Sequence, residues 1–222
     1  MSRFRLARDE QGYYLDDIFS RQKPLRANFI EPALLTRLGR AGKKSELVAR
    51  AVRSESGLRV LDCTAGLARD SLILAYLGCQ VTLCERSPVM QCLLADALER
   101  AQDHEMLGPA VSRMTLVPSD AISMLDSGIE HDVVYLDPMF PEKEGSAAVR
   151  GSMQYLQRFL GVDEDTDRLL ETALYMHCDR VVLKRPAKGG TLHSELPEPI
   201  HVFKNRNSRF EVYSPIRKTG QS

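Results

Sequence analysis

From residue 58 onward, short apolar runs alternate with longer segments of helical periodicity, and this alternation constrains the fold most. The apolar runs cover 58–64, 80–85, 113–120, 132–138 and 180–186, and helical segments cover 69–78, 87–101, about 121–125 and 166–178. Gly78 lies where the first helix ends, and Ser87 with Pro88 begins the second. The repeated order of strand, helix and strand predicts a doubly wound α/β domain with a mostly parallel sheet. HVFKNR (201–206) and RFEVYS (209–214) predict a closing antiparallel hairpin.

The first 57 residues do not join this alternation. They are rich in Arg and Lys, and Gly39 and Gly42 precede a short apolar segment at 45–52. We expect a short helix there, capped by Ser45. The sequence therefore predicts an N-terminal extension (1–57) packed against an edge of the sheet of the main domain (58–222).

Length, charge and cysteine content exclude several classes of protein. A chain of 222 residues suffices for one domain. Lys plus Arg and Asp plus Glu number 30 each, so no overall positive field indicates a nucleic-acid partner. The five cysteines form no CxxC pair, which predicts reduced thiols and no bound metal. No stretch approaches the roughly 18 apolar residues needed to span a membrane, so we expect a cytoplasmic protein.

Acidic residues follow four of the predicted strands. The first strand ends at Asp62 in DCTAGLARD, the second at Glu85, the third before Asp120 and the fourth at Asp137. In open α/β sheets these strand ends meet at one ligand-binding edge. Such acids suit a ligand with hydroxyls, an amine and a positive centre, and S-adenosylmethionine has all three. Taken singly, Asp62, Asp70 and Asp120 could instead be helix caps or surface charges.

A dinucleotide is disfavoured at this edge, because of the expected glycines only Gly66 is present. The fourth strand runs into DPMF (137–140). This segment resembles the D/N/S-P-P-F/Y/W motif of methyltransferases that modify planar amino groups, with Met139 in place of the second proline. By that resemblance, Asp137 and the Pro138 carbonyl accept hydrogen bonds from the target amine, and Phe140 stacks on its ring.

Four segments together resemble one family: TAGLARDS (64–71), LCERSPVMQCLLADAL (83–98), VVYLDPMFP (133–141) and VVLKRP (181–186). In this order and spacing they are similar to the bacterial ribosomal RNA small subunit methyltransferase J family. The resemblance runs from about Phe29 to Tyr213. It implies a Rossmann-like, class I S-adenosylmethionine-dependent enzyme that forms N2-methylguanosine near the 3′ end of 16S rRNA, with the methyltransferase domain at 58–222.

The resemblance also assigns residues. The donor-binding positions fall on Arg69, Asp70, Glu85, Arg86, Asp120, Ala121 and Asp137, to which the strand-end argument adds Asp62 and Gly66. The catalytic positions are Asp137, Pro138 and Phe140. Two departures stand out, because the family pattern has glycine where this chain has Ala68 and a serine pair where it has Asp120-Ala121.

Local cations would have to meet the phosphates of 16S rRNA or the 30S subunit. The candidates are Lys143, Arg150, Lys184, Arg185 and Lys188, and the segment 141–154 is a candidate lid. Three alternatives stay open: adenine N6 or a protein glutamine as the target amine, a non-catalytic RNA-binding assembly factor, and a nicotinamide oxidoreductase. Intact Asp137, Pro138 and Phe140 argue against the second alternative, and the missing glycines argue against the third.

Overall fold

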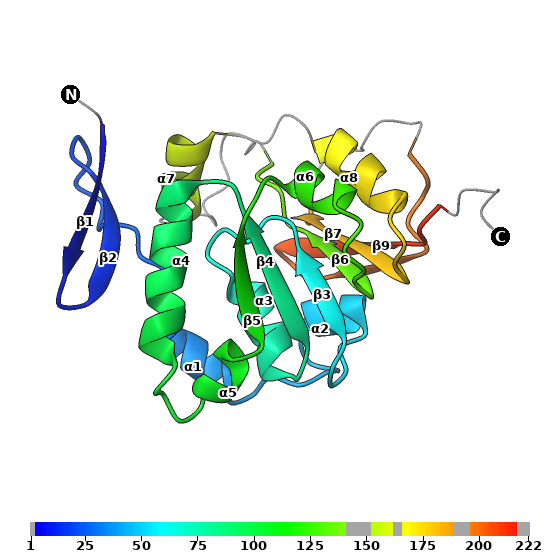
Figure 1. Ribbon diagram of the computed structural model, residues 1–222, viewed down its shortest axis with the longest axis horizontal. Helices are drawn as coiled ribbons and strands as arrows, with labels where there is room; N and C mark the ends of the chain where they lie inside the picture. Colours follow the sequence, from blue (N-terminus) through cyan, green and yellow to red (C-terminus); the bar gives the residue numbers. More distant parts are fainter. Residues whose placement is uncertain (1–2, 141–151, 162–165, 189–195, 217–222) are drawn as a thin grey trace.

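The apolar runs form the parallel strands of one sheet. The computed structural model describes residues 3–140, 152–161, 166–188 and 196–216. Within them seven strands join in this order: β5 (Met114–Pro118), β4 (Gln80–Glu85), β3 (Arg59–Asp62), β6 (Val133–Leu136), β7 (Arg180–Pro186), β9 (Ser208–Tyr213) and β8 (His201–Lys204). The first five strands are parallel, whereas β9 and β8 are antiparallel (Figure 1). The predicted mostly parallel, Rossmann-like sheet with a closing hairpin is confirmed.

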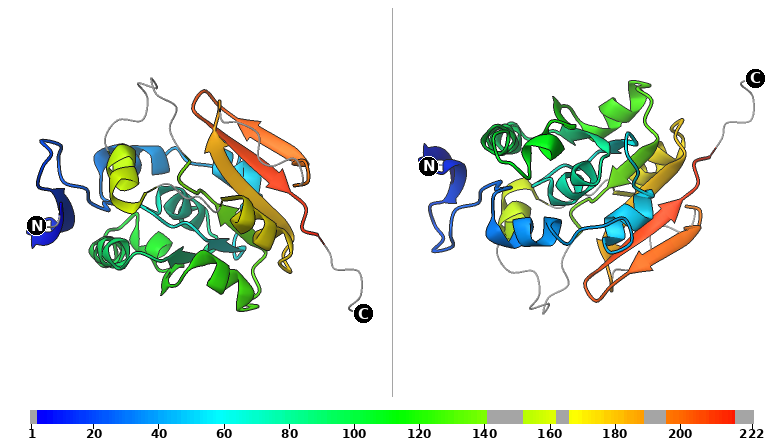
Figure 2. Two further views of the ribbon diagram at one scale, coloured as in Figure 1. Left: turned by 90° about the horizontal axis from the view of Figure 1, so that it is seen from above. Right: turned by 90° about the horizontal axis from the view of Figure 1, so that it is seen from below.

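Helices cover both faces of this sheet, because side chains alternate along each strand. On one face, Val60, Leu83 and Tyr135 share an apolar core with helices, while Leu61 and Val134 belong to a second core on the opposite face. The first core includes α2 (Leu47–Val52), α3 (Arg69–Tyr76), α4 (Pro88–Ala101) and α5 (Gly108–Val111). The second includes α6 (Ala121–Asp126) and α8 (Thr166–Leu174). The sheet is thus the middle layer of three (Figure 2).

Helices α3 and α4 begin where the sequence predicts. The Ser87 hydroxyl accepts a hydrogen bond from the Met90 N–H at 3.4 Å, and Pro88 is the first residue of α4. Such an N-cap stabilises a helix by about 1 kcal/mol. Gly78, just beyond α3, has φ 104°, a left-handed conformation that favours glycine.

The order of connection places the topological switch point of the sheet between β3 and β6. The chain moves outward from β3 to β4 and β5, and then returns to place β6 on the other side of β3. In open α/β sheets ligands bind at this switch point.

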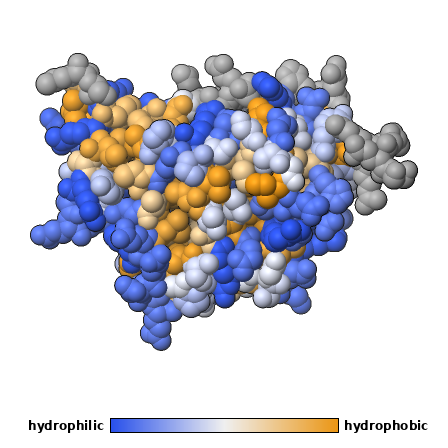
Figure 3. All heavy atoms as spheres, viewed as in Figure 1, coloured by the Kyte–Doolittle hydropathy of each residue, from blue (hydrophilic) through white to orange (hydrophobic). Residues whose placement is uncertain are grey.

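The N-terminal segment is more structured than its sequence suggests. It contains the hairpin β1 (Phe4–Asp9) and β2 (Gly12–Asp17), then α1 (Pro32–Leu38), and lastly α2. The hairpin lies at one end of the molecule beside α4 (Figure 1). Leu6, Ile18 and Phe19 are exposed there, and apolar surface is visible at this end (Figure 3).

Two details of this segment differ from the sequence-based expectation. Helix α2 begins after Glu46, and Ser45 does not cap it, because the Ser45 hydroxyl donates to the carbonyls of Arg40 and Gly42. The segment also does not simply lie along a sheet edge. Its hairpin packs on α4 and on α7 (Ser152–Leu160), whereas α2 contacts β7, β8 and β9. None of the described helices is long and apolar enough to cross a membrane.

Candidate active site

A cavity of about 330 Å³ opens at the carboxyl ends of β3, β4, β5 and β6. Its lining includes every residue that the sequence assigned to the methyl donor: Asp62, Gly66, Arg69, Asp70, Glu85, Arg86, Asp120, Ala121 and Asp137. These residues span 76 positions of the chain, and the strand order brings them to one place. Cavities of this size bind small molecules and cofactors.

The loop after β3 is held in a tight turn by its own acid. One Asp62 oxygen accepts the Thr64 N–H at 3.0 Å, and the other accepts the Ser71 hydroxyl. Asp62 is 2% exposed, and burial raises the pKa of its carboxyl to about 7, although these hydrogen bonds oppose the shift. Both oxygens therefore accept hydrogen bonds from the protein, and Asp62 stabilises the loop after β3, which we call the donor loop because it would hold the methyl donor.

The same loop contains two residues in left-handed conformations. Gly66 has φ 53° and Ala68 has φ 51°. A left-handed conformation costs a residue with a Cβ roughly 1–2 kcal/mol. Glycine, which the resemblance leads us to expect at the position of Ala68, would adopt this conformation without that strain.

Glu85 closes the donor loop from the neighbouring strand. Its two carboxylate oxygens accept the Gly66 N–H at 3.2 Å and the Ser87 N–H at 2.8 Å. Burial raises the pKa of Glu85, and these two N–H donors oppose the shift. Each carboxylate oxygen can accept a second hydrogen bond, so Glu85 can still receive hydroxyl donors from the cavity.

Asp120, the acid after β5, also has a structural role. Asp120 is the N-cap of α6, and one of its oxygens accepts the N–H groups of Ile122 and Ser123 at 3.0 and 3.3 Å. This is the helix-capping alternative that the sequence left open, and it is realised at a residue that also lines the cavity. The second oxygen is available for a ligand amine.

A charged cluster joins the loops after β3 and β6. The Lys184 ammonium lies 2.8 Å from Asp70 and 2.7 Å from Asp137, and the Tyr135 hydroxyl donates to Asp70 at 2.9 Å. Burial alone would raise the pKa of Asp70, but Lys184 prevails and lowers it. Burial would lower the pKa of Lys184, yet the two carboxylates hold it above its usual range.

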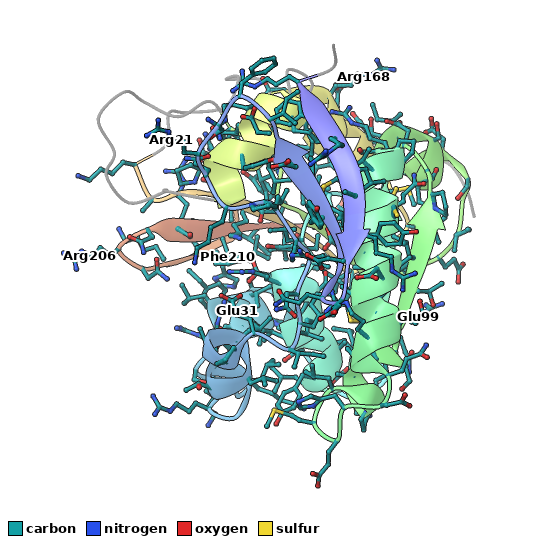
Figure 4. The ribbon with its side chains drawn as sticks, turned by 90° about the vertical axis from the view of Figure 1, so that its left-hand side faces the viewer. Arg21, Glu31, Glu99, Arg168, Arg206 and Phe210 are labelled. Carbon is teal, nitrogen blue, oxygen red and sulfur yellow. The ribbon has the colours of Figure 1, made fainter. Side chains whose placement is uncertain are left out.

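Arginines form the outer wall of the cavity. Arg69, in the first turn of α3, pairs with Glu31 at 2.7 Å, and Glu31 lies just before α1 (Figure 4). Arg37 pairs with Glu46 at 2.7 Å and lies 3.9 Å from Asp70. Within the described ranges, no group of three or more His, Cys, Asp or Glu side chains is arranged to hold a metal ion.

Known proteins resemble this chain over most of its length. The family model for SAM-dependent methyltransferases matches residues 2–215. Ribosomal RNA small subunit methyltransferase J of Marinobacter nauticus is 44% identical over 87% of this chain and 70% of its own length. Its namesake in Ectopseudomonas mendocina is 39% identical over 98% of this chain and 85% of its own.

The chain belongs to the ribosomal RNA small subunit methyltransferase J family. A crystal structure of a SAM-dependent methyltransferase from Neisseria gonorrhoeae supports the fold, with a TM-score of 0.74 and 31% identity over 95% of this chain and 82% of that one. S-adenosylmethionine is the cofactor of the family, and the acids that line the cavity fit its hydroxyls, amines and sulfonium charge.

The DPMF segment, which the sequence predicts to be catalytic, follows β6. Asp137 lines the cavity, and its side chain is 30% exposed. Pro138 is buried beside it, and Phe140 packs against the second core with the Arg185 guanidinium 5.4 Å from its ring centre. Phe140 does not line the cavity, so its role in stacking on the target base stays a prediction.

The cations predicted to bind RNA occupy different environments. Lys143 and Arg150, together with most of the candidate lid at 141–154, lie outside the described residues. Lys184 is paired inside the cavity, and Arg185 is buried and pairs with Glu211 at 3.3 Å. Lys188 is exposed beyond the end of β7. Of the described candidates, Lys188 is therefore the best placed for a phosphate.

Sequence reasoning overlooked several residues of this site. Arg37, Thr64, Tyr135 and the α7 residues Leu156 and Leu160 all line the cavity. Tyr135 carries the one detectable signal, because a hydroxyl in the middle of a buried strand needs a polar partner. Arg37 and α7 come from segments outside the strand-end pattern, so no local signal connects them to the site.

Proposed function

We propose that this protein transfers a methyl group from S-adenosylmethionine to the exocyclic N2 of a guanosine near the 3′ end of 16S rRNA. The observation that carries the proposal is the position of Asp137, an acid of the DPMF segment, on the wall of the cavity that we assign to the methyl donor. The names of the relatives support ribosomal RNA of the small subunit as the substrate.

Several residues would hold the donor. Glu85 would accept hydrogen bonds from the ribose hydroxyls, and Asp120 would accept one from the adenine amine. Asp70 and Arg69 lie at the start of α3, where they would contact the amino acid end of the donor. When bound, S-adenosylmethionine supplies a methyl group already activated by a sulfonium, so the protein has mainly to position the acceptor.

The acceptor side uses Asp137 and the backbone that follows it. A guanine presents N1–H and N2–H donors on one edge, and the Asp137 carboxylate with the Pro138 carbonyl offers two acceptors. Hydrogen bonds to both would align the N2 lone pair with the cavity. The amino group becomes acidic only as the new C–N bond forms, and its proton then passes to Asp137 or to water.

RNA contacts would come from cations outside the cavity. Lys188 lies beyond the end of β7. Figure 4 shows Arg21, after β2, and Arg206, in the β8–β9 turn, both projecting toward the left of the view. A chain with no overall positive charge needs such local cations to neutralise phosphates.

The test is methylation of ribosomal subunits by the purified protein. Radiolabelled S-adenosylmethionine is incubated with 30S subunits that lack this modification, and the nucleosides of the 16S rRNA are then separated. We expect label in N2-methylguanosine. Label in N6-methyladenosine or in a ribosomal protein would redirect the assignment to another amine, and an absence of label with the donor bound would contradict RNA methylation.

A further inference from the structure

The position of Lys184 in the structure does not suit a role in phosphate binding. It lies on β7, where Leu183 pairs with Leu136 of β6, and the alternation of the strand directs its side chain to the face that carries α3. Its side chain is 22% exposed, and its ammonium contacts Asp70 and Asp137 at 2.8 and 2.7 Å. A phosphate could bind this ammonium only if it displaced the carboxylates of Asp70 and Asp137.

The contact with Lys184 uses only half of the Asp137 carboxylate. Lys184 contacts Oδ2, and within the part of the chain that the structure describes no donor contacts Oδ1. The backbone of the same residue is also fixed, because the Asp137 N–H donates to the Thr64 hydroxyl at 2.6 Å. Asp137 thus has a fixed backbone, one occupied oxygen and one oxygen open to the cavity.

We propose that Lys184 is a positioning residue that holds the Asp137 carboxylate in one orientation, with Oδ1 directed to the amine that is methylated. This inference rests on the proposed function of Asp137 as the acceptor of that amine. Through Asp70, at the start of α3, Lys184 also joins the acceptor to the loop that would hold the methyl donor.

The charged and titratable groups around Asp137 determine the effect of removing Lys184. Asp137 faces Lys184 from β7, Asp70 from α3, Asp62 from β3 and the Tyr135 hydroxyl from β6, and Arg37 faces Asp70 from α1. Lys184 is the one cation in contact with Asp137 among these groups. Without it, the two carboxylates repel each other in a buried site, and the pKa of Asp137 rises.

The decisive variant is Lys184→Met, which keeps the length of the side chain and removes the charge. We expect kcat at neutral pH to fall at least about tenfold, because a protonated or misoriented Asp137 cannot hold the amine. We also expect the acid limb of the pH profile of kcat to move up by about one unit or more. The KM for RNA and the salt dependence of RNA binding should stay as in the wild type.

A second variant distinguishes the positioning role of Lys184 from a role in folding. Lys184→Met combined with Asp70→Asn removes the cation and one of its two partners, so Asp137 no longer faces a neighbouring negative charge at Asp70. At saturating S-adenosylmethionine, which is needed because Asp70 is also assigned to the donor, the acid limb should return toward its wild-type position in this double variant. A role in folding alone would not produce this reversal.

A third measurement does not depend on RNA. In protein labelled with ¹³C at the aspartate carboxyls, the Asp137 signal is assigned through Asp137→Asn, and its titration is compared between the wild type and Lys184→Met. We expect proton uptake at higher pH in the variant. Identical titration curves would overturn the positioning role even if the wild type methylated guanine. A shifted curve would support it even if no RNA were methylated, and in that case only the proposed function would fail.

One further result would overturn the proposal directly. If Lys184→Met lowered RNA affinity and the salt slope while the pH profile of kcat stayed unchanged, Lys184 would be a phosphate contact.

Discussion

The backbone N–H of Asp137 donates a 2.6 Å hydrogen bond to the side-chain hydroxyl of Thr64, 73 positions earlier in the chain. Thr64 belongs to the turn after β3, and its own N–H is held by Asp62 at 3.0 Å. The two loops that flank the cavity are therefore fixed to each other before any ligand binds. Rigid support of this kind keeps reacting groups aligned, and small misplacements of such groups cost large factors in rate.

Replacement of the acid in the DPMF segment should stop catalysis. In Asp137→Ala the amine loses its charged acceptor, and we expect kcat to fall by a factor of about 10² or more. The fold should survive, because Lys184 keeps its contact with Asp70 at 2.8 Å. Label transfer to 30S subunits measures the rate, and Asp126→Ala, at an exposed acid at the end of α6, is the matched control. Wild-type turnover in Asp137→Ala would refute the amine-binding role.

Replacement of the acid after β4 should weaken binding of the methyl donor. Glu85→Ala removes a carboxylate that fixes Gly66 and can accept the ribose hydroxyls. Hydrogen bonds to a charged group are worth about 1.5–3 kcal/mol, which predicts roughly 10- to 150-fold weaker binding of S-adenosylmethionine. Calorimetry measures the affinity directly. Glu99→Ala, on the exposed face of α4 (Figure 4), should bind as the wild type does, and equal affinities in both variants would remove Glu85 from the site.

The raised pKa of Asp62 predicts a pH-dependent contribution to stability. An aspartate titrates near pH 4 in the unfolded chain, whereas Asp62 titrates at about 7 in the folded protein. Between these values the folded state holds the extra proton, so this contribution to the free energy of unfolding is lost as pH rises from about 4 to 7. Asp62→Asn has no such proton to lose.

The measurement for Asp62 is urea unfolding at several pH values. The stability of Asp62→Asn relative to the wild type should rise from pH 4 to pH 7 by up to about 4 kcal/mol, and then level off. Asp103→Asn, at an exposed acid after α4, should show a constant offset. Parallel curves for Asp62→Asn and the wild type would mean that Asp62 titrates as an ordinary acid.

Neutralising the exposed cation beyond β7 should weaken RNA binding in a salt-dependent way. Lys188→Gln removes one potential phosphate contact, so the slope of log affinity against log salt should become shallower by about 0.7–0.9. Arg59→Gln removes one charge at the amino end of β3, the opposite end of the sheet from the cavity. Binding titrations at several salt concentrations should separate the two variants, and matching slopes would place the RNA surface elsewhere.

The parallel core of this fold was predictable because each of its elements carries its own signal. Strand β4 lies at 80–85 as predicted, and α4 begins after the Ser87 cap as predicted. Acids at strand ends were enough to find the cavity, since parallel strands place their carboxyl ends at one edge. Four segments of the sequence together, among them the one that follows β6, resemble the family to which the chain belongs.

The N-terminal hairpin and the partners of Lys184 could not be predicted from the sequence. Strand β1 reads FRLARD and has no clean alternation, because the strand is largely exposed and only Phe4 and Ala7 are half-buried. From the sequence alone, Lys184 is a cation at the end of a predicted strand and a candidate for binding RNA. Its true environment depends on Asp70, 114 positions away, which only the packing of α3 against the sheet brings near.

The hydrogen bond from the Tyr155 hydroxyl to the Leu15 carbonyl, 2.8 Å long, joins residues 140 positions apart. Tyr155 is 2% exposed, and Phe4 packs against its ring at 5.9 Å between ring centres. During synthesis the hairpin and α4 would be present well before α7 emerges. Contacts of such long sequence separation form late, because closing the loop costs entropy. The contact between the hairpin and α7 should therefore form late in folding, whereas the hairpin can pack on α4 as soon as α4 has been synthesised.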